Sequence, residues 1–325
     1  MKIAIVTDQE RVNFLPGAEG IQEDKQKKET VEYIKKALRD EYDVIALTMN
    51  QDLIKNLKNE RVDLVFNLCN GVRGEASLSQ LPSLLEMNGI PYTASGPLGH
   101  GLAYNKIYSG KLFKASNIAT PGFTYVSSIE EIEDIKLEFP LLVKPKDEGS
   151  SRGIQDNSLL YDKEALINKI EESLSLYNPP IMIMEYIDGK EFTVGVLGNG
   201  DNTRILPILE IDFSKLPEGL NKIYSFEVKF KYDDKMIYHI PARIDEDTRK
   251  KIEKAAIDAF KSLNLKDYAR VDIRVKNGIP YVIEINSLPG LDEHSSDICK
   301  MAASAGIGYD ELIKEIVEIA IKRNN

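Results

Sequence analysis

Short apolar segments alternate with helical segments along the first hundred residues. Three of the apolar segments have the length of a strand, at residues 2–7, 42–47 and 62–66. Between the first two, Val31, Ile34 and Leu38 repeat with a helical period, while lysines occupy the opposite face. Strands that alternate with helices are typical of a parallel sheet covered by helices. We therefore predict a doubly wound α/β domain over residues 1–100.

The length and charge of the chain limit the kinds of protein to which it can belong. At 325 residues it exceeds the usual size of a single core, so two or three domains are expected. Its 42 basic and 52 acidic residues give a net charge of -10 without a basic block, which disfavours a nucleic-acid partner. Cys69 and Cys299 are the only cysteines, which argues against a disulfide framework and for a reducing compartment. No signal peptide or membrane-length apolar run is visible, so we expect a cytoplasmic protein without a membrane partner.

The C-terminal third of the chain carries the densest set of candidate ligands. Side chains two residues apart on a strand face the same way, so Arg270 projects beside Asp272, and Glu284 beside Asn286. Mg²⁺ prefers such oxygen ligands and completes its shell with water and phosphate. Arg270 could neutralise charge that develops during phosphoryl transfer. The alternative is a hairpin with solvated charges.

The two strands must be joined so that these ligands meet. Asp272 and Glu284 are an even number of residues apart, and directly opposed residues share one face of a sheet. Asn277-Gly278 by itself favours a two-residue turn, which would place the two carboxylates on opposite faces. We therefore predict a three-residue turn at Asn277, Gly278 and Ile279, or a bulge, with a positive φ at Gly278.

Two earlier segments offer what a nucleotide needs. The apolar run 141–145 ends at Lys144-Pro145, and the hydroxyl-rich segment 148–154 that follows can surround phosphate oxygens with N–H groups and hydroxyls. A strand at 181–187 precedes Glu191, so its backbone could pair with an adenine edge and leave Glu191 for the ribose hydroxyls. A loop of glycine and serine is also typical of a plain turn. The ordered series, rather than one loop, indicates a nucleotide site.

In that order the residues resemble the ATP-grasp superfamily and, within it, the D-alanine:D-alanine ligase branch. The matching segments cover nearly the whole chain: Val65-Phe66-Asn67, Gly74-Glu75, residues 84–96, Asn105-Lys106, Val143-Lys144-Pro145, residues 150–153, Glu191-Phe192, residues 269–272 and residues 284–290. The resemblance implies an N-terminal doubly wound parallel-sheet domain followed by two α+β ATP-grasp domains, at 101–198 and 199–325, with ATP between them. It also implies a ligase that uses ATP and Mg²⁺, or alternatively Mn²⁺, to convert a carboxylate into an acyl phosphate, which an amine then attacks.

The resemblance gives each matching residue a role. For the nucleotide it implies phosphate contacts by Lys106, Lys144, Ser150, Ser151 and Gly153, adenine contacts by Glu185, Tyr186 and Ile187, and a ribose contact by Glu191. For the chemistry it implies Mg²⁺ ligation by Asp272, Glu284 and Asn286, and stabilisation of a tetrahedral intermediate by Arg270 and the Gly290 N–H. Residues 224–230 match the loop that closes over the active site, with Lys229 as a phosphate contact. Phe230 stands where many members have a tyrosine, and we favour apolar cover over a role in selectivity for it.

The residues that would recognise the substrates depart from the branch. D-alanine-specific members begin with a glycine-serine-glutamate segment that holds the first ammonium group, but this chain has Thr7-Asp8-Gln9-Glu10-Arg11 there. Asn70-Gly71 replaces the usual His-Gly, and Met184 stands where a glutamate is common. The carboxylates available for an amino group are Glu10, Glu19 and Glu75, of which Glu75 has the matching context. Ser295 and Ser296 both fit the site of the second substrate's carboxylate, and we prefer Ser296 as the N-cap of the following helix.

We therefore expect a carboxylate-amine ligase whose partners are ATP and small amino acids, with a homodimer as a possible assembly. D-alanine:D-alanine ligation is the first choice of activity, followed by another dipeptide or a D-alanyl ester. D-alanine alone should be a poor or non-unique substrate, because the segment that would bind its ammonium group is missing. The alternative is an ATP-binding regulatory protein without ligation, which would not require Arg270.

Overall fold

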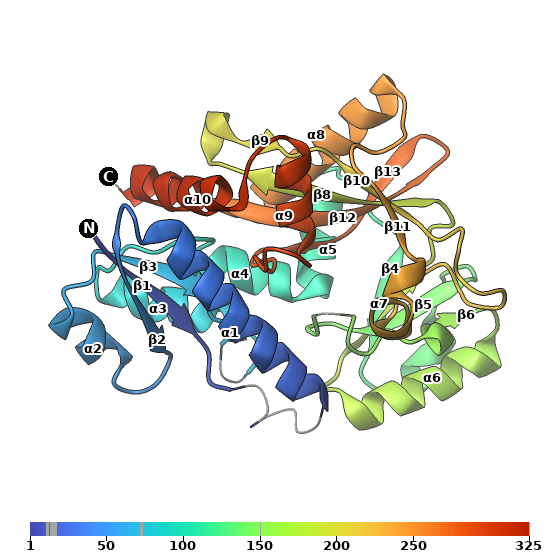
Figure 1. Ribbon diagram of the computed structural model, residues 1–325. Helices are drawn as coiled ribbons and strands as arrows, with labels where there is room; N and C mark the ends of the chain where they lie inside the picture. The colour runs from blue at the N-terminus through green and yellow to red at the C-terminus, as the bar shows by residue number, and fades with distance from the viewer. Residues whose placement is uncertain (11–12, 14–17, 72–73, 150, 325) are drawn as a thin grey trace.

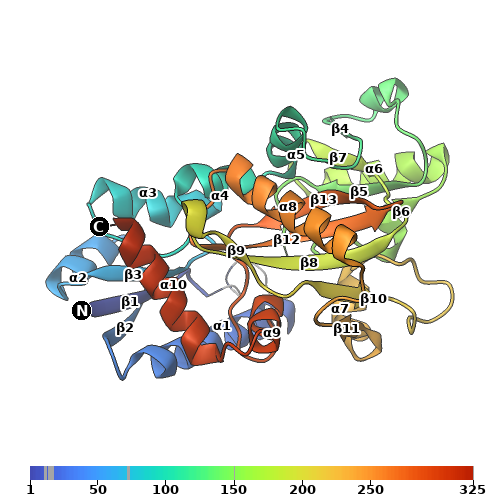
Figure 2. The same ribbon diagram turned by 90° about the horizontal axis from the view of Figure 1, so that it is seen from above.

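The chain forms three sheets with helices packed on them. The computed structural model describes residues 1–325 apart from 11–12, 14–17, 72–73, 150 and 325, and apart from the side chains of residues 18, 19, 226, 229, 230 and 233. In two perpendicular views, the N-terminal sheet and the sheet of residues 123–185 lie at opposite ends of the molecule, with the largest sheet between them (Figures 1 and 2). Both termini lie at the end that holds the N-terminal sheet.

The N-terminal domain is a parallel sheet with helices on both faces. Its strands are β1 (Lys2–Thr7), β2 (Asp43–Thr48) and β3 (Leu64–Leu68), in the order β2-β1-β3. Alternate side chains of a strand face opposite ways. Ile3 and Ile5 of β1 therefore pack with α1 (Ala18–Leu38), while Ala4 and Val6 pack with α2 (Leu53–Asn59) and α3 (Gln80–Met87). Burial on both faces explains the uninterrupted apolar runs and confirms the doubly wound α/β prediction.

A four-stranded antiparallel sheet forms the other end of the molecule. It is preceded by α4 (Pro97–Tyr104) and α5 (Lys106–Ala115), and the Asn105 side chain caps α5 by accepting hydrogen bonds from the N–H groups of Ile107 and Tyr108. The strands are β4 (Phe123–Val126), β5 (Leu141–Pro145), β6 (Leu159–Leu160) and β7 (Ile181–Glu185), in the order β4-β7-β5-β6. Helix α6 (Lys163–Leu176) covers one face with Leu166 and Ile170.

The central sheet has six strands and joins segments that are far apart in sequence. They are β8 (Lys190–Leu197), β9 (Arg204–Ile205), β10 (Leu209–Asp212), β11 (Ile237–His239), β12 (Tyr268–Lys276) and β13 (Ile279–Asn286). Their order is β11-β10-β8-β12-β13, with β9 paired to β8, and α8 (Glu246–Ser262) packs on one face. The boundary between these two sheets therefore lies between β7 and β8, on the N-terminal side of the domain boundary that we predicted at residue 198. The combination of parallel and antiparallel sheets agrees with the α/β and α+β classes that we predicted.

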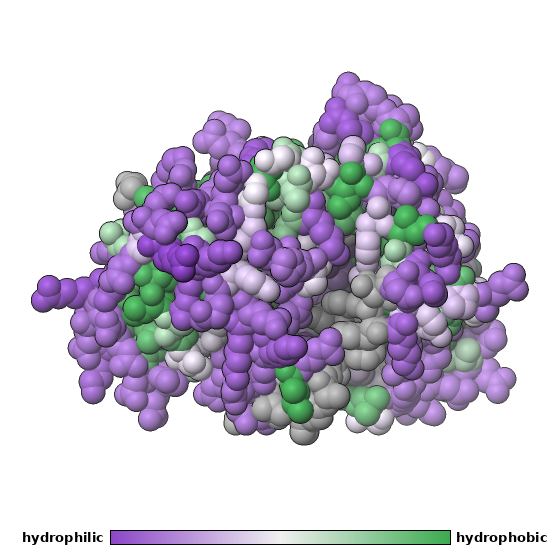
Figure 3. Space-filling view, viewed as in Figure 1, coloured by the Kyte–Doolittle hydropathy of each residue, from purple (hydrophilic) through white to green (hydrophobic). Residues whose placement is uncertain are grey.

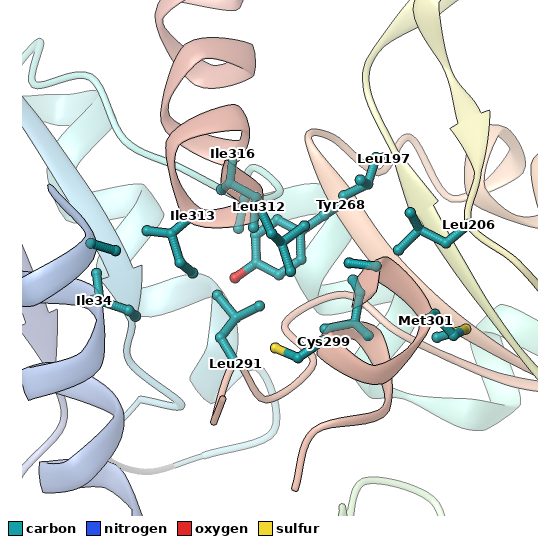
Figure 4. Packing of buried hydrophobic residues seen from close by; sticks show 14 of the residues in the cluster. Ile34, Leu197, Leu206, Tyr268, Leu291, Cys299, Met301, Leu312, Ile313 and Ile316 are labelled. Atoms are coloured by element: carbon teal, nitrogen blue, oxygen red, sulfur yellow. The ribbon is translucent and has the colours of Figure 1, made fainter. Parts of the chain in front are cut away.

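The last two helices attach the central sheet to the N-terminal domain. Helices α9 (Asp297–Ser304) and α10 (Tyr309–Asn324) carry side chains such as Met301, Ile313 and Ile316, which pack with Ile34 of α1 and Leu197 of β8 (Figure 4). A polar network lies beside this core, where buried Asp267 accepts hydrogen bonds from the Ala94 N–H at 2.8 Å and from Arg323 at 3.1 Å. The last helix and the segment that follows the N-terminal sheet are thus joined through one buried carboxylate.

The face of the molecule shown in Figure 3 is mostly polar. On the face shown in Figure 3, hydrophilic residues predominate and apolar ones form small separate groups. Within the described part of the chain, no helix has both the length and the apolar character that a membrane span requires.

Candidate active site

The hairpin of β12 and β13 brings the predicted metal ligands onto one face. Its turn has two residues, Asn277 and Gly278, with φ values of 52° and 72°, as expected for an Asn-Gly hairpin turn. The three-residue turn that we predicted is therefore wrong, whereas the alternative bulge and the positive φ of Gly278 are confirmed. Ile273 pairs with Val282 but Asp272 pairs with Glu284, so Ile283 is the extra residue of the bulge.

Arg270, Asp272 and Asn286 form one hydrogen-bonded group beyond the bulge. The Arg270 guanidinium donates to both carboxylate oxygens of Asp272, at 3.0 and 2.9 Å, and the Asn286 amide donates to Asp272 at 3.1 Å. Thr193 on β8, which sequence reasoning missed, donates to Asp272 at 2.9 Å. Burial lowers the pKa of Arg270, but Asp272 and Asp297 raise it by more, so the guanidinium stays charged.

Glu284 lies between this group and two lysines, of which Lys144 is buried and Lys106 is partly buried. The Lys144 ammonium, on β5, is 3.2 Å from the Glu284 carboxylate and only 1% exposed. Burial raises the pKa of Glu284, but Lys144, Lys106 and Arg270 outweigh it and hold that pKa at about 2. Lys106 donates to the Glu148 carbonyl at 2.6 Å, and its pKa is lowered by burial and by the neighbouring Lys144. Three cations thus surround one carboxylate, an arrangement that suits a polyanionic ligand.

The donor set of this hairpin fits a Mg²⁺ ion. Asp272 and Glu284 are opposed across the two strands, and Asn286 opposes Arg270 one pair further on. The Asn286 amide nitrogen faces Asp272, which leaves its carbonyl oxygen free to act as a ligand. No set of three His, Cys, Asp or Glu side chains in the described part of the chain is arranged to hold a metal. In the predicted set the third ligand is an amide oxygen. Two carboxylates and an amide, with water and phosphate, meet the preference of Mg²⁺.

The predicted phosphate loop lies against the start of the predicted closing segment. We call this segment, residues 224–230, the lid, and the residues 221–224 at its start the base of the lid. Ser151 has a φ of 61° and donates from its hydroxyl to the Tyr224 carbonyl at 2.8 Å. Gly153 has a φ of 76°, and a Cβ there would lie 2.5 Å from the ring of Pro145, so no other residue fits without movement. Ser150 lies outside the described residues. The loop and the lid are therefore in direct contact.

The lid itself contains a short helix rather than only a loop. Helix α7 (Phe226–Lys231) begins after Ser225, whose hydroxyl accepts a hydrogen bond from the Val228 N–H at 3.2 Å. Asn221, at the base of the lid, donates from its backbone N–H to Asp156 at 2.8 Å. The side chains of Lys229 and Phe230 are outside the described part of the structure, so their predicted roles stay predictions.

The segment after β7 has the polar and apolar groups that an adenine base needs. The Glu185 N–H is already bonded to the Gly122 carbonyl at 2.8 Å, and the Tyr186 N–H to the Pro140 carbonyl at 3.0 Å. The Ile187 N–H has no hydrogen-bond partner among the described residues. An apolar cluster lies beside this segment. Its buried members are Ile107 of α5 and Met182 and Met184 of β7, and the partly buried Phe123 of β4 and Ile283 of β13 pack against them.

The turn after β13 carries the predicted substrate groups. The Gly290 N–H has no partner among the described residues, and a Cβ at Gly290 would lie 3.0 Å from the Ser296 hydroxyl. Ser296 is the N-cap of α9, but its hydroxyl accepts from the Asp292 N–H at 2.8 Å instead of from the helix, so the side-chain cap that we predicted is wrong. Ser295 donates to Asp292 at 2.7 Å and accepts from Gln26 of α1 at 2.8 Å.

Comparison with known proteins matches residues 113–318 to the family described as D-ala D-ala ligase C-terminus. The chain belongs to the D-alanine:D-alanine ligase family. It is 36% identical over 261 residues to the uncharacterized protein y4sG of Sinorhizobium fredii, and this match covers 80% of this chain and 75% of that protein. It is 32% identical over 291 residues to D-alanine--D-alanine ligase of Clostridium perfringens, covering 88% of this chain and 90% of that protein.

Solved structures of this ligase family share the whole fold. D-alanine--D-alanine ligase from Bacillus anthracis complexed with ATP matches 100% of this chain and 98% of its own, with a TM-score of 0.76 and 26% identity. VanG D-Ala:D-Ser ligase from Enterococcus faecalis matches 98% of this chain and 99% of its own, with a TM-score of 0.74 and 22% identity, which supports the fold alone. The ATP-grasp assignment and the predicted fold class are thereby confirmed.

The carboxylates that we predicted for the first substrate's ammonium group lie in different surroundings, and their role stays a prediction. Glu75 is 80% exposed and lies 3.9 Å from buried Lys146, and Glu10 forms an exposed ion pair with Lys28 at 2.8 Å. The side chain of Glu19 is outside the described residues. Asp8, which we did not predict, is buried at the end of β1 and forms an ion pair with Lys27 of α1. Its position at the carboxyl end of a parallel strand is one where ligands bind in open α/β sheets.

Proposed function

We propose that this protein is an ATP- and Mg²⁺-dependent ligase that joins the carboxylate of one amino acid to the amine of a second. The observation that carries the proposal is the position of Glu284, opposite Asp272 on the adjacent strand and 3.2 Å from the buried Lys144 ammonium. The transfer of a phosphoryl group requires positioning and charge stabilisation more than covalent chemistry. The oxygen ligands of the hairpin and the buried cation beside them meet both requirements.

Each part of the nucleotide has residues suited to it. Buried Lys144 and partly buried Lys106 supply positive charge for phosphate oxygens, and the loop around Ser151 and Gly153 supplies backbone N–H groups. The Ile187 N–H can donate to the base, while the apolar residues around Met184 cover its faces. Asp272, Glu284 and Asn286 would hold Mg²⁺, which would supply positive charge to neutralise the phosphates.

The proposed reaction has two bond exchanges. The substrate carboxylate oxygen attacks the γ-phosphorus of ATP, and the bond from that phosphorus to ADP breaks. The amine of the second substrate then attacks the acyl carbon, and phosphate leaves with the oxygen it took from the carboxylate. Arg270 and the Gly290 N–H would stabilise the oxyanion formed at that carbon, and the lid after Ser225 would exclude water.

The substrates are best described as small amino acids. D-alanine is the first candidate because a D-alanine--D-alanine ligase is 32% identical over 291 residues. We propose, however, that D-alanine alone is not the exclusive substrate, because Asp8 and Lys27 occupy the end of β1 in place of the expected ammonium-binding glutamate. A D-alanyl ester and a dipeptide with another amino acid are the next candidates.

A panel assay tests this proposal. The protein is incubated with ATP, Mg²⁺ and single or paired D- and L-amino acids or hydroxy acids, and phosphate release and products are measured. We expect phosphate release to depend on both an acceptor and a carboxylate donor, with at least one pair more active than D-alanine alone. Exclusive and efficient D-alanyl-D-alanine formation would contradict the specificity proposal. The absence of amino-acid-dependent phosphate release would favour the regulatory alternative.

A further inference from the structure

Arg274 is a buried arginine in the expected nucleotide site that no motif pointed to. It follows Arg270 and Asp272 at two-residue intervals on β12, so all three face the same side of the sheet. Its direct partner across the sheet is Glu191 on β8, and the Arg274 side chain is only 6% exposed. A buried guanidinium is retained only where its donors are matched by acceptors.

The guanidinium of Arg274 connects the three predicted nucleotide-binding elements. It donates to Glu191 through Nε at 2.9 Å and through a terminal nitrogen at 2.6 Å. Another nitrogen donates to the Ile187 carbonyl at 3.0 Å, and the guanidinium carbon lies 4.7 Å from the centre of the Tyr186 ring. Arg274 also donates to the Lys222 carbonyl at the base of the lid, which accepts a second hydrogen bond from the Tyr186 hydroxyl at 3.0 Å.

Arg274 occupies only one of the two oxygens of Glu191. Both of its hydrogen bonds to this carboxylate end on Oε2, and Oε1 accepts no hydrogen bond from the described residues. Glu191 is 14% exposed, so its free oxygen is not sealed in the core. Burial raises the pKa of Glu191, and the charge of Arg274 opposes that shift. A carboxylate held in this way presents one oriented acceptor.

We propose that Arg274 is the positioning residue for sugar recognition: it fixes Glu191 so that Oε1 accepts a hydrogen bond from a ribose hydroxyl of the nucleotide. This inference rests on the proposed function for the identity of the ligand. Loss of Arg274 removes the partner that orients Glu191 and leaves a partly buried carboxylate without a cation. The protein should then lose its preference for a ribonucleotide over the analogue that lacks the hydroxyl. That preference arises because the analogue leaves the oriented carboxylate oxygen of Glu191 without a hydrogen bond.

Binding of three nucleotides measures this preference without any need for catalysis. Calorimetric titrations with ATP, 2′-deoxy-ATP and 3′-deoxy-ATP in the presence of Mg²⁺ are compared between the unaltered protein and Arg274→Met. The unaltered protein should bind ATP about tenfold more tightly than one of the two analogues, and Arg274→Met should bind ATP and that analogue almost equally. The analogue that is discriminated against identifies the hydroxyl.

Two further variants keep the test valid if Arg274→Met does not fold. Glu191→Ala removes the free acceptor and puts no other polar group in its place, so it should lose the same preference. Arg274→Lys keeps the charge but not the forked geometry, so it should restore only part of the preference relative to Arg274→Met.

Arg323 provides a matched control. It also contacts a buried carboxylate, that of Asp267, and donates to two backbone carbonyls, those of Tyr92 and Ala94. Arg323→Met should lower stability but keep the sugar preference. An Arg274→Met protein that keeps the full preference, or an unaltered protein that has none, would overturn the inference. Sugar discrimination without amino-acid-dependent phosphate release would instead overturn the proposed ligase activity and leave the role of Arg274 standing.

Discussion

Asp272 and Glu284 lie directly opposite each other on β12 and β13, although the turn between the strands has only two residues. A regular two-residue hairpin would pair Asp272 with Ile283, so the bulge at Ile283 is what brings the two carboxylates together. Ile283 also packs with the apolar side chains beside the predicted adenine site. One inserted residue thus serves both the metal ligands and the nucleotide pocket.

Asp272→Ala should abolish turnover. The change removes one of two carboxylate ligands and leaves Arg270 without its bidentate partner, so phosphate release with Mg²⁺ should fall by roughly a thousandfold or to background. Asp258→Ala is a suitable control, because Asp258 is paired with Lys254 on the exposed face of α8 and lies on no candidate site. Near-normal phosphate release by Asp272→Ala at ordinary Mg²⁺ would show that the metal assignment is wrong.

Ser296→Ala should weaken binding of the second substrate more than that of ATP. The Ser296 hydroxyl lies next to Gly290 and at the start of α9, where N–H groups favour a carboxylate. We expect the apparent KM for the amine substrate to rise by roughly tenfold while the KM for ATP changes little. Ser295→Ala decides between the neighbouring serines. A larger rise in that variant, with Ser296→Ala unchanged, would transfer the role to Ser295.

Sequence periodicity predicted which side chains share a face, but not how the chain achieves it. The even separation of Asp272 and Glu284 required a bulge or an odd turn, and only tertiary packing of Ile283 decided between them. Arg274 had a visible signal, since it continues the alternation of Arg270 and Asp272. Its partner Glu191 is 83 residues away, and that pairing depends on β8 lying beside β12, a non-local contact that a local pattern does not contain.

The same limit applies to the domains and to substrate recognition. The apolar runs of the parallel sheet predicted its strands because burial on both faces leaves no polar positions. The predicted boundary at residue 198 follows β8 in sequence, whereas the sheet to which β8 belongs is set by its pairing with β12. The ion pair of Asp8 with Lys27 was not predicted either, because it depends on where α1 crosses the end of β1.

Asp267→Ala should destabilise the whole protein. Asp267 is fully buried and contacts Arg323 of α10, Asn199 and the Ala94 N–H, so its loss leaves several donors unsatisfied. We expect the free energy of unfolding to fall by roughly 3 kcal/mol or more, as for other buried ion pairs with one partner removed. Urea denaturation measures the change. Glu315→Ala, which removes the partly exposed partner of Arg204, should cost less than about 1 kcal/mol. Equal losses in the two variants would contradict the role of Asp267.

The transfer of a labelled oxygen tests most directly whether the reaction passes through an acyl phosphate. The preferred amino-acid donor is labelled with ¹⁸O in its carboxylate and incubated with ATP, Mg²⁺ and the acceptor, and the released phosphate is examined by mass spectrometry. We expect each phosphate to carry one ¹⁸O atom from the carboxylate, because that oxygen bonds to phosphorus before the amine displaces the phosphate. Phosphate without the label, formed at the same rate as product, would contradict it.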